Sequence, residues 1–127
     1  MREFNHHFIA TLTQLDYGRN VAFLALDQAS GDILGVVRLH ADPDHRNAEF
    51  AVIVRSDLKG HGLGTNLMKL AIRYGQTEGY VAITGQVLQE NQAMLKLCRE
   101  LGFEHEESDQ DGIFNMRLVL RSGPERY

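Results

Sequence analysis

The stretch AEFAVIVRSDLKGHGLGTNLM, residues 48–68, joins three patterns in succession. Residues 48–54 are almost all apolar and contain valine and isoleucine, which predicts a strand. Glycine then occupies every second position, at Gly60, Gly62 and Gly64. Leucines at helical spacing follow. The stretch therefore predicts a strand, a glycine-rich turn and a helix.

A glycine-rich turn between a strand and a helix is suited to binding phosphate. Glycine lets backbone amides approach a ligand closely, and a helix N-terminus offers free N–H groups with partial positive charge. The turn is not a P-loop, because Thr65 and Asn66 follow Gly64 where lysine and a hydroxyl residue are required. It also lacks the G-x-G-x-x-G spacing of the dinucleotide fingerprint. The remaining alternative is a turn that only connects strand and helix, for which one glycine would serve.

The segments before this stretch predict a short helix followed by sheet. Residues 8–16 place Phe8, Leu12 and Leu15 about one helical turn apart, which predicts a short amphipathic helix. Turn-forming residues then separate three apolar segments. These segments predict an antiparallel meander of three strands, at residues 21–27, 33–41 and 48–54.

The segments after it predict two helices and the rest of the sheet. An apolar stripe that ends near Gly79 predicts the first helix, with Leu63, Leu67, Leu70, Ala71 and Tyr74 on one face. Residues 80–87 predict a strand parallel to residues 48–54, because a whole helix separates the two. A second helix stops at Gly102 and aligns Met94, Leu97, Cys98 and Leu101. Residues 103–107 and 112–120 complete a mixed α/β architecture.

Composition favours one domain without a membrane span. The 127 residues are 43% hydrophobic, enough for one core. A net charge of −4 argues against nucleic-acid binding. One cysteine and no apolar run of membrane-spanning length favour a soluble, cytoplasmic protein. The six histidines lack metal-ligand spacing, so we expect no metal.

Two motifs in this order resemble those of the GNAT acetyltransferase superfamily. K-G-H-G-L-G, residues 59–64, resembles the pyrophosphate-binding signature, with Lys59 where glutamine or arginine is usual. Asn91, Leu97, Cys98, Gly102 and Phe103 match a second element further along the chain. The resemblance extends over most of the chain and is closest to the GNAT domain of bacterial Pat-type protein lysine acetyltransferases.

The resemblance implies a GNAT fold, a mixed α+β fold with helices flanking a central, mostly antiparallel sheet. Its two central strands are parallel and splayed. We expect residues 1–127 to form a single GNAT acetyltransferase domain. Because predicted sheet begins only at Val21, we also expect the family's N-terminal strand to be missing or truncated.

The resemblance also implies an acyltransferase of EC class 2.3.1 that uses acetyl-CoA. Its acceptor would be a protein lysine, such as one of acetyl-CoA synthetase, and a homodimer is one expected assembly. A lysine amine is protonated at neutral pH and must lose a proton before it attacks a thioester. By motif position the general base is Glu49, which alternation places on one strand face with Ala51 and Ile53. The alternative is that Glu49 is simply solvated at the start of its strand.

Family membership further implies which residues hold the cofactor. They would lie on the central strand, in the glycine turn and at the start of the second helix: Val52, Ile53, Val54, Lys59, Gly60, His61, Gly62, Leu63, Gly64, Thr65 and Asn91. An ordinary helix cap is an equal alternative for Asn91. Cys98 stands where many family members carry a tyrosine that protonates the departing thiolate, and its position on the apolar stripe favours a small core residue.

Three functions follow from these observations. The first is a protein lysine acetyltransferase that transfers directly from acetyl-CoA. The second is a small-molecule amine N-acetyltransferase, which needs a closed pocket. The third is a non-catalytic acyl-CoA-sensing module, which needs the glycine turn but no base. Glu49 separates the third function from the other two.

Overall fold

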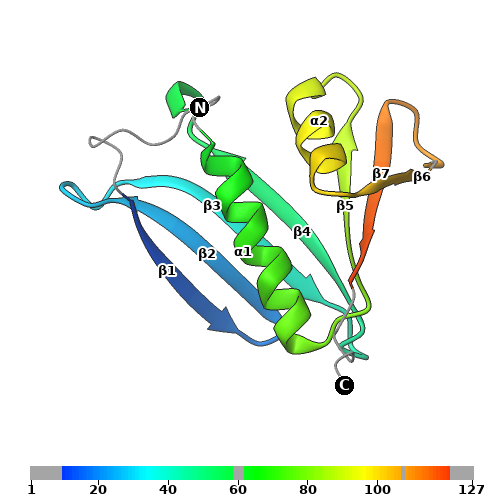
Figure 1. The fold of residues 1–127 in the computed structure, drawn as a ribbon, viewed down its shortest axis with the longest axis horizontal. Coiled ribbons are helices and arrows are strands. Elements are labelled where there is room, and N and C mark those ends of the chain that lie inside the picture. Colours follow the sequence, from blue (N-terminus) through cyan, green and yellow to red (C-terminus); the bar gives the residue numbers. More distant parts are fainter. Residues whose placement is uncertain (1–9, 59–61, 107, 121–127) are drawn as a thin grey trace.

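The structure is a computed structural model that describes residues 10–58, 62–106 and 108–120, with side chains from residue 13. Within these residues the chain forms a mixed seven-stranded sheet and two α-helices (Figure 1). The strands are β1 (Ala10–Tyr17), β2 (Asn20–Asp27), β3 (Ile33–Ala41), β4 (Asn47–Val54), β5 (Ala82–Leu88), β6 (Glu104–Glu106) and β7 (Ile113–Val119). The helices are α1 (Leu63–Glu78) and α2 (Gln92–Glu100), and a 3-10 turn η2 spans Ser56–Leu58.

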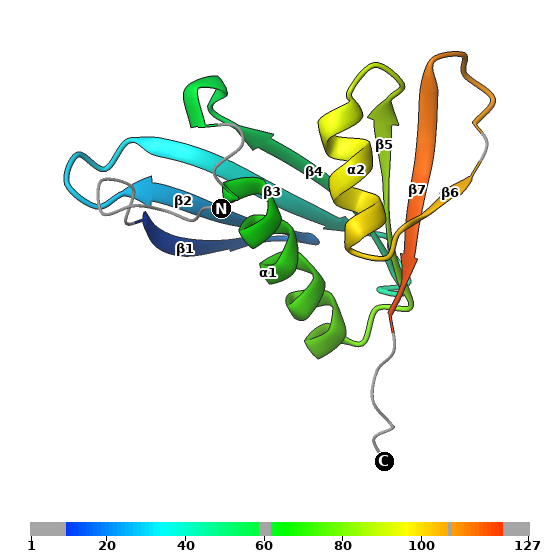
Figure 2. The ribbon, with the colours of Figure 1, turned by 45° about the horizontal axis from the view of Figure 1, so that its top comes forward.

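The sheet has the strand order β1-β2-β3-β4-β5-β7-β6. Strands β1 to β4 form an antiparallel meander, and β5 lies parallel to β4 because α1 carries the chain back between them. The expected mixed, mostly antiparallel GNAT fold is confirmed. Figures 1 and 2 show the two halves of the sheet diverging from a narrow junction between β4 and β5.

The helix expected over residues 8–16 is wrong over the part that the structure describes. Residues 10–17 form strand β1, in register with β2 from Ala10 opposite Asp27 to Tyr17 opposite Asn20. Gly18 and Arg19 make the connecting two-residue turn, in which Gly18 has a φ of 62°. A positive φ at the first turn position suits glycine and matches the twist of a hairpin. Sheet therefore begins before Val21, and four strands form the meander.

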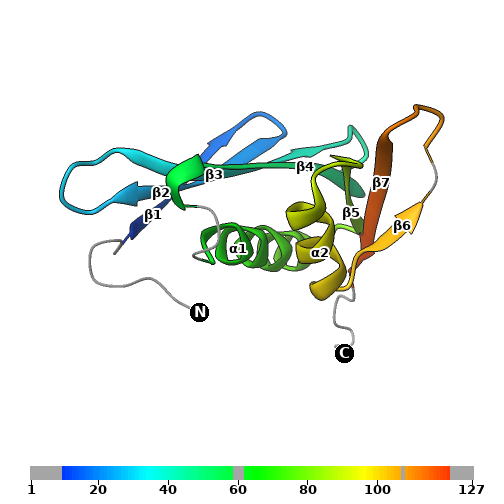
Figure 3. The same cartoon turned by 90° about the horizontal axis from the view of Figure 1, so that it is seen from above.

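Both helices lie on the same face of the sheet (Figure 3). The apolar stripe of α1 is confirmed, with Leu63, Leu67 and Ala71 buried, and its end is confirmed at Gly79, a left-handed cap. Helix α2 buries Leu95 and Cys98. The core fills the space between these helices and the inner face of the sheet. The opposite face, here called the outer face, carries no helix within the described residues.

Candidate active site

Strands β4 and β5 pair over only three residues before they separate. Asn47, Ala48 and Glu49 lie opposite Ala82, Ile83 and Thr84, and the ladder ends there. Strand β4 continues to Val54 paired with β3, whereas β5 continues to Leu88 paired with β7. The β5-facing edge of β4 is therefore without a strand partner after Glu49. We call the space between the two diverging strands the strand gap.

Backbone groups of alternate β4 residues point into this strand gap. Asp42 N–H donates to the Asn47 carbonyl at 2.9 Å, and Arg55 N–H donates to the Leu34 carbonyl at 2.9 Å. These two bonds show that odd-numbered residues of β4 direct their backbone groups away from β5 and towards β3. Since the direction alternates along a strand, even-numbered residues face the gap.

This alternation divides the three predicted cofactor contacts of β4. Val52 and Val54 direct their backbone N–H and C=O groups into the strand gap, where no strand bonds them. Ile53 instead pairs with Val36 of β3, and its side chain lies 72% exposed on the outer face. The register therefore does not support backbone binding of a cofactor by Ile53. Phe50 shares the orientation of Val52 and was missed by sequence reasoning.

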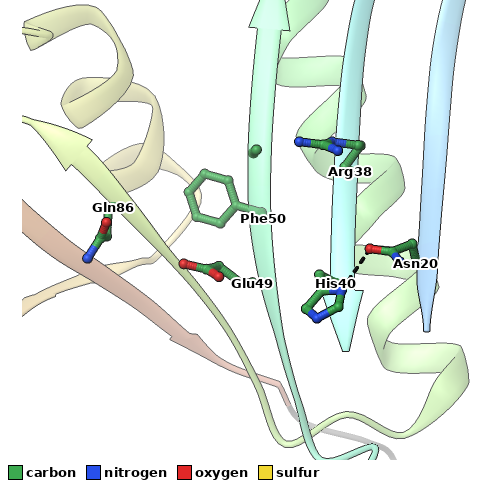
Figure 4. A pocket seen from close by; sticks show the side chains of 7 residues that line it. Asn20, Arg38, His40, Glu49, Phe50 and Gln86 are labelled. Carbon is green, nitrogen blue, oxygen red and sulfur yellow. Dashed lines mark hydrogen bonds between the residues drawn. The ribbon is translucent and has the colours of Figure 1, made fainter. Parts of the chain in front are cut away.

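An open pocket of about 420 Å³ lies beside the point where the strands separate. Its lining comes from four strands, and Figure 4 shows the polar side chains that surround it. The residues are Asn20 on β2, Arg38 and His40 on β3, Glu49, Phe50 and Ala51 on β4, and Gln86 on β5. Glu49 is the only one of these that the sequence analysis assigned to the site.

Glu49 reaches the pocket because of strand alternation. Glu49, Ala51 and Ile53 are exposed on the outer face, while Phe50 points inward and is buried, so the predicted division of β4 faces is confirmed. The carboxylate lies at the side of β4 that faces β5, and Glu49 is part of the last residue pair of the parallel ladder, opposite Thr84. Glu49 is exposed and lines the pocket, so its exposure agrees with both a base and a solvated carboxylate.

His40 and Asn20 form one side of the pocket. His40 Nδ1 lies 2.7 Å from Asn20 Oδ1, and the two residues are paired across β2 and β3. Because the amide oxygen can only accept, this contact is a hydrogen bond when Nδ1 carries the proton. Nε2 is then left to face a ligand. His40 is also the β3 partner of Glu49, so both side chains project from one row of the outer face.

The described part of the glycine turn leads into the N-terminus of α1. Gly62 is the N-cap in a left-handed conformation with a φ of 85°, and its carbonyl accepts the Asn66 N–H at 3.0 Å. The N–H groups of the first helical turn, at Leu63, Gly64 and Thr65, precede that bond and have no helical partner. Lys59, Gly60 and His61 lie outside the described residues.

Gly64 stands where this turn meets the strand gap. A side-chain carbon at Gly64 would contact Val54 Cγ2 at 3.6 Å and Leu97 Cδ2 at 3.7 Å. Helix α1 therefore begins between the end of β4 and helix α2. The N-terminus of α1 therefore lies beside the end of β4, the strand whose backbone at Val52 and Val54 faces the strand gap.

Asn91 and Cys98 both have structural roles in α2. Asn91 is the N-cap, and its Oδ1 accepts the Met94 N–H at 3.2 Å. Cys98 is fully buried in the core, and this burial raises the pKa of its thiol to about 11. The expectation that Cys98 is a small core residue is confirmed.

The described residues contain neither a cluster of metal-ligating side chains nor a helix that could span a membrane. Across residues 10–58, 62–106 and 108–120, no three His, Cys, Asp or Glu side chains gather closely enough to hold a metal ion. Neither described helix combines the length and the apolar character needed to cross a membrane.

Comparison with known proteins agrees with this geometry. The model of the acetyltransferase (GNAT) family matches residues 2–103. The chain belongs to this family. Its members are N-acetyltransferases that take the acyl group from acetyl-CoA. In this GNAT chain, the pocket around Glu49 and the strand gap are therefore the candidate active site.

Curated relatives of this GNAT chain include two kinds of acetyltransferase. An acetyltransferase of Pseudomonas aeruginosa is 28% identical over 87% of this chain and 61% of its own length. The spermidine N(1)-acetyltransferase of Escherichia coli is 35% identical over 62% of this chain and 44% of its own length. The chain thus spans about half the length of the curated relatives that it matches.

Solved structures share the same fold. A GNAT-family acetyltransferase of Streptococcus pneumoniae has a TM-score of 0.74 at 23% identity, covering 81% of this chain and 68% of its own. The GNAT domain of PAT from S. lividans has a TM-score of 0.73 at 22% identity, covering 85% and 65%. A spermidine/spermine N-acetyltransferase of Vibrio cholerae has a TM-score of 0.67 at 26% identity, covering 80% and 68%.

Proposed function

We propose that this chain is an acetyl-CoA-dependent N-acetyltransferase that acts on a protein lysine, with Glu49 as general base. The observation that carries the proposal is the position of Glu49. Its carboxylate lines an open pocket at the residue where β4 and β5 separate. A base must stand beside the bond that is made, and this is where the outer face meets the strand gap.

The acceptor amine reaches the reaction with a proton that it must lose. Its reference pKa is about 10.4, so at neutral pH it arrives as an ammonium ion. Glu49 would accept one proton from the ammonium group, which leaves a neutral amine able to form a bond to the acetyl carbon of the thioester. As the bond from that carbon to sulfur breaks, the nitrogen releases its second proton and the departing thiolate of coenzyme A takes it up. The backbone N–H of Val52, which faces the gap beyond the end of the ladder, is suited to stabilise the oxyanion.

The residues proposed to hold acetyl-CoA come from three elements. Val52 and Val54 offer unpaired backbone groups to the pantetheine arm. The first turn of α1 offers its N–H groups to the pyrophosphate, because a helix N-terminus carries partial positive charge. Asn91 keeps a proposed role through its Nδ2, since only its Oδ1 is used in the cap. Lys59, Gly60 and His61 stay proposed phosphate contacts from the motif alone.

Support for a protein lysine as acceptor comes from the resemblance to Pat-type enzymes and from the shape of the site. The fold is shared with the GNAT domain of PAT. The pocket is open to the outer face, so a lysine on a large protein could reach Glu49 from that side. Proximity of amine and thioester would then supply much of the catalysis.

A small amine is the second candidate acceptor. The observation in its favour is the 35% identity to spermidine N(1)-acetyltransferase over 62% of this chain. A third candidate function is an acyl-CoA-binding module without catalysis, which would use α1 and the strand gap but not Glu49.

The test is acetyl transfer by the wild type and by Glu49→Gln. Purified protein is mixed with acetyl-CoA and either acetyl-CoA synthetase or spermidine, and both thiol release and acetylated product are measured by mass spectrometry. Glu49→Gln keeps the size of the side chain and removes the base. Glu100→Gln is the matched control, because Glu100 is an exposed carboxylate on α2 that does not line the pocket.

Acetyl-lysine formation that falls at least about tenfold in Glu49→Gln, and not in Glu100→Gln, supports the proposal, since general base catalysis contributes about 10²–10⁴-fold. Acetylated product from spermidine, without any from acetyl-CoA synthetase, would contradict a protein lysine as acceptor and favour a small amine. Acetyl-CoA binding without transfer to either acceptor would favour the sensing module. Equal activity of Glu49→Gln and wild type would remove Glu49 as the base.

A further inference from the structure

Arg38 is a cation in the candidate active site that the proposed chemistry does not use. It lies on β3, is exposed on the outer face and lines the pocket together with Glu49. Among the residues that the structure describes, no carboxylate pairs with its guanidinium, although Arg55 pairs with Asp57 at 2.8 Å. Arginine side chains in a polar pocket are suited to bind carboxylates through two parallel N–H donors.

The strands beside Arg38 leave room for a ligand group. Its partner on β2 is Ala22, and its partner on β4 is Ala51. Because neither alanine projects beyond its Cβ, no cross-strand neighbour fills the space beside the guanidinium. Figure 4 shows the Arg38 side chain directed from β3 towards β4. The guanidinium group of Arg38 is therefore open to the pocket.

Arg38 and Glu49 are diagonal neighbours across β3 and β4. Glu49 pairs with His40, and Arg38 pairs with Ala51, two residues further along β4. Side chains in this relationship start from positions about 7–8 Å apart and project from the same face. The pocket thus presents the Glu49 carboxylate where the ammonium group of the acceptor must bind, and the Arg38 guanidinium on the neighbouring strand.

We propose that the acceptor carries a carboxylate close to the reacting amine, and that Arg38 binds this carboxylate. The inference rests on the proposed function, because it assigns the acceptor class of the same site. For a protein substrate, the acetylated lysine has an aspartate or glutamate beside it. The ammonium group of the acceptor faces the Glu49 carboxylate, and the carboxylate of the acceptor faces the Arg38 guanidinium. Specificity arises from this charge complementarity.

The same charges discriminate against polyamines. Spermidine carries several positive charges, and a second ammonium group near the reacting one approaches the Arg38 guanidinium. Like charges at such a distance repel, and this repulsion is strongest at low ionic strength. A basic acceptor is therefore disfavoured at the position that an acidic acceptor occupies.

The experiment compares matched peptides and matched variants. Short capped peptides contain one lysine flanked on both sides by Asp or, in the second peptide, by Asn, which has nearly the same shape without the charge. Initial rates of acetylation give kcat/KM for the wild type, Arg38→Gln, Arg38→Glu and the control Arg73→Gln. Arg73 is an exposed arginine on α1, the helix that covers the opposite face of the sheet.

We expect the wild type and Arg73→Gln to prefer the Asp peptide by about two- to fivefold, the size of one exposed ion pair. Arg38→Gln loses this preference, because it slows the Asp peptide by a larger factor than the Asn peptide. Arg38→Glu reverses the charge and raises activity on spermidine relative to the Asp peptide.

Equal kcat/KM values for the two peptides in the wild type would overturn the assignment of Arg38, and the proposed function would stand. A preference for Asp that survives in Arg38→Gln would overturn it as well. Equilibrium binding of the same peptides in the presence of coenzyme A provides a second measurement that needs no transfer. Tighter binding of the Asp peptide that depends on Arg38 supports the inference even if Glu49→Gln shows that the proposed base is wrong.

Discussion

The aromatic ring of Phe50 lies in the space that a side chain at Gly85 would occupy. A Cβ added to Gly85 would come within 2.6 Å of Phe50 Cδ2 and closer still to Cε2. Phe50 and Gly85 are the residues that follow the last pair of the β4–β5 ladder. The ring also packs edge to face on Phe103, with 5.4 Å between ring centroids. Phe50 thus fills the inner side of the strand gap at the point where it opens.

Replacing Gly85 with alanine should destabilise the protein through this contact. The added methyl group overlaps the Phe50 ring, and overpacking of this kind costs about 1–3 kcal/mol of unfolding free energy. Urea unfolding measures the loss. Gly85→Ala combined with Phe50→Leu should lose less than the two single changes together, because the smaller residue removes the overlap. Additive losses would show that the ring does not limit Gly85.

Gly64→Ala should separate cofactor binding from stability. A methyl group at Gly64 meets Val54 and Leu97 only at ordinary contact distances, so the free energy of unfolding should change little. The same methyl group stands where α1 and the strand gap meet, and it should weaken acetyl-CoA binding several-fold. Calorimetric titration with acetyl-CoA checks the affinity. Unchanged affinity would place the cofactor elsewhere.

Gly62→Ala should lower the stability of the protein, whereas Gly64→Ala should leave it nearly unchanged. Gly62 has a φ of 85°, and among the described residues no atom apart from those of its chain neighbours lies within 4 Å of an added Cβ. The cost is therefore backbone strain alone, about 1–2 kcal/mol for a residue in the left-handed region. Thermal unfolding measures it, and Gly62→Asn should cost less, since asparagine tolerates this conformation better.

Asn91 allows its two proposed roles to be measured separately. Asn91→Ala removes the bond to Met94 N–H and should cost about 1 kcal/mol of stability. Asn91→Asp keeps the accepting oxygen and should retain that stability. If Nδ2 also binds acetyl-CoA, Asn91→Asp lowers the affinity for acetyl-CoA at unchanged stability. If Asn91 is only a cap, the affinity stays the same in Asn91→Asp.

Burial of Cys98 predicts a pH dependence on the alkaline side. Desolvation raises the pKa of the thiol from 9.0 to about 11. The folded state therefore holds the proton more tightly than the unfolded chain, and this contribution to stability is complete below pH 9. It is lost as pH rises through 11. Unfolding free energies of the wild type should fall over this range more steeply than those of Cys98→Ala.

A labelling experiment supports the same conclusion about Cys98. A fully buried thiol with a raised pKa should react with iodoacetamide only when the chain unfolds. Native protein should stay unlabelled at pH 8, while protein in urea is labelled at once. Rapid labelling of the native state would contradict the burial of Cys98.

The strand and helix order could be predicted because its signals are local. The leucine stripe of α1 and its cap at Gly79 follow from a period that burial imposes on a helix. Leu12 and Leu15 are spaced like one face of a helix, so the sequence pattern predicts a helix where β1 forms. Gly18 is the local signal for the hairpin that joins β1 to β2. The pairing of β1 with β2 outweighs the intrinsic spacing, which is the usual effect of tertiary context on a short segment.

The pocket was harder to predict because it depends on register between distant strands. Arg38 and His40 alternate with buried neighbours on β3, and this pattern could have marked both as facing one side. Nothing local shows that Asn20, Glu49 and Gln86 face that side at the same level. Glu49 was found from the family motif, whereas Arg38, Asn20 and Gln86 emerged only from the assembled sheet.

The short ladder between β4 and β5 also affects the order in which the chain can fold. Strands β1 to β4 each pair with the next strand in sequence, so tight turns can establish that half early. The parallel ladder forms only after the chain has closed a much longer loop that includes α1. Only three residue pairs of this ladder offset the entropy lost in that closure. We therefore expect the two halves of the sheet to unfold as separate cooperative units, joined at the junction between β4 and β5. A cofactor bound across this junction would contact both halves and slow their separation.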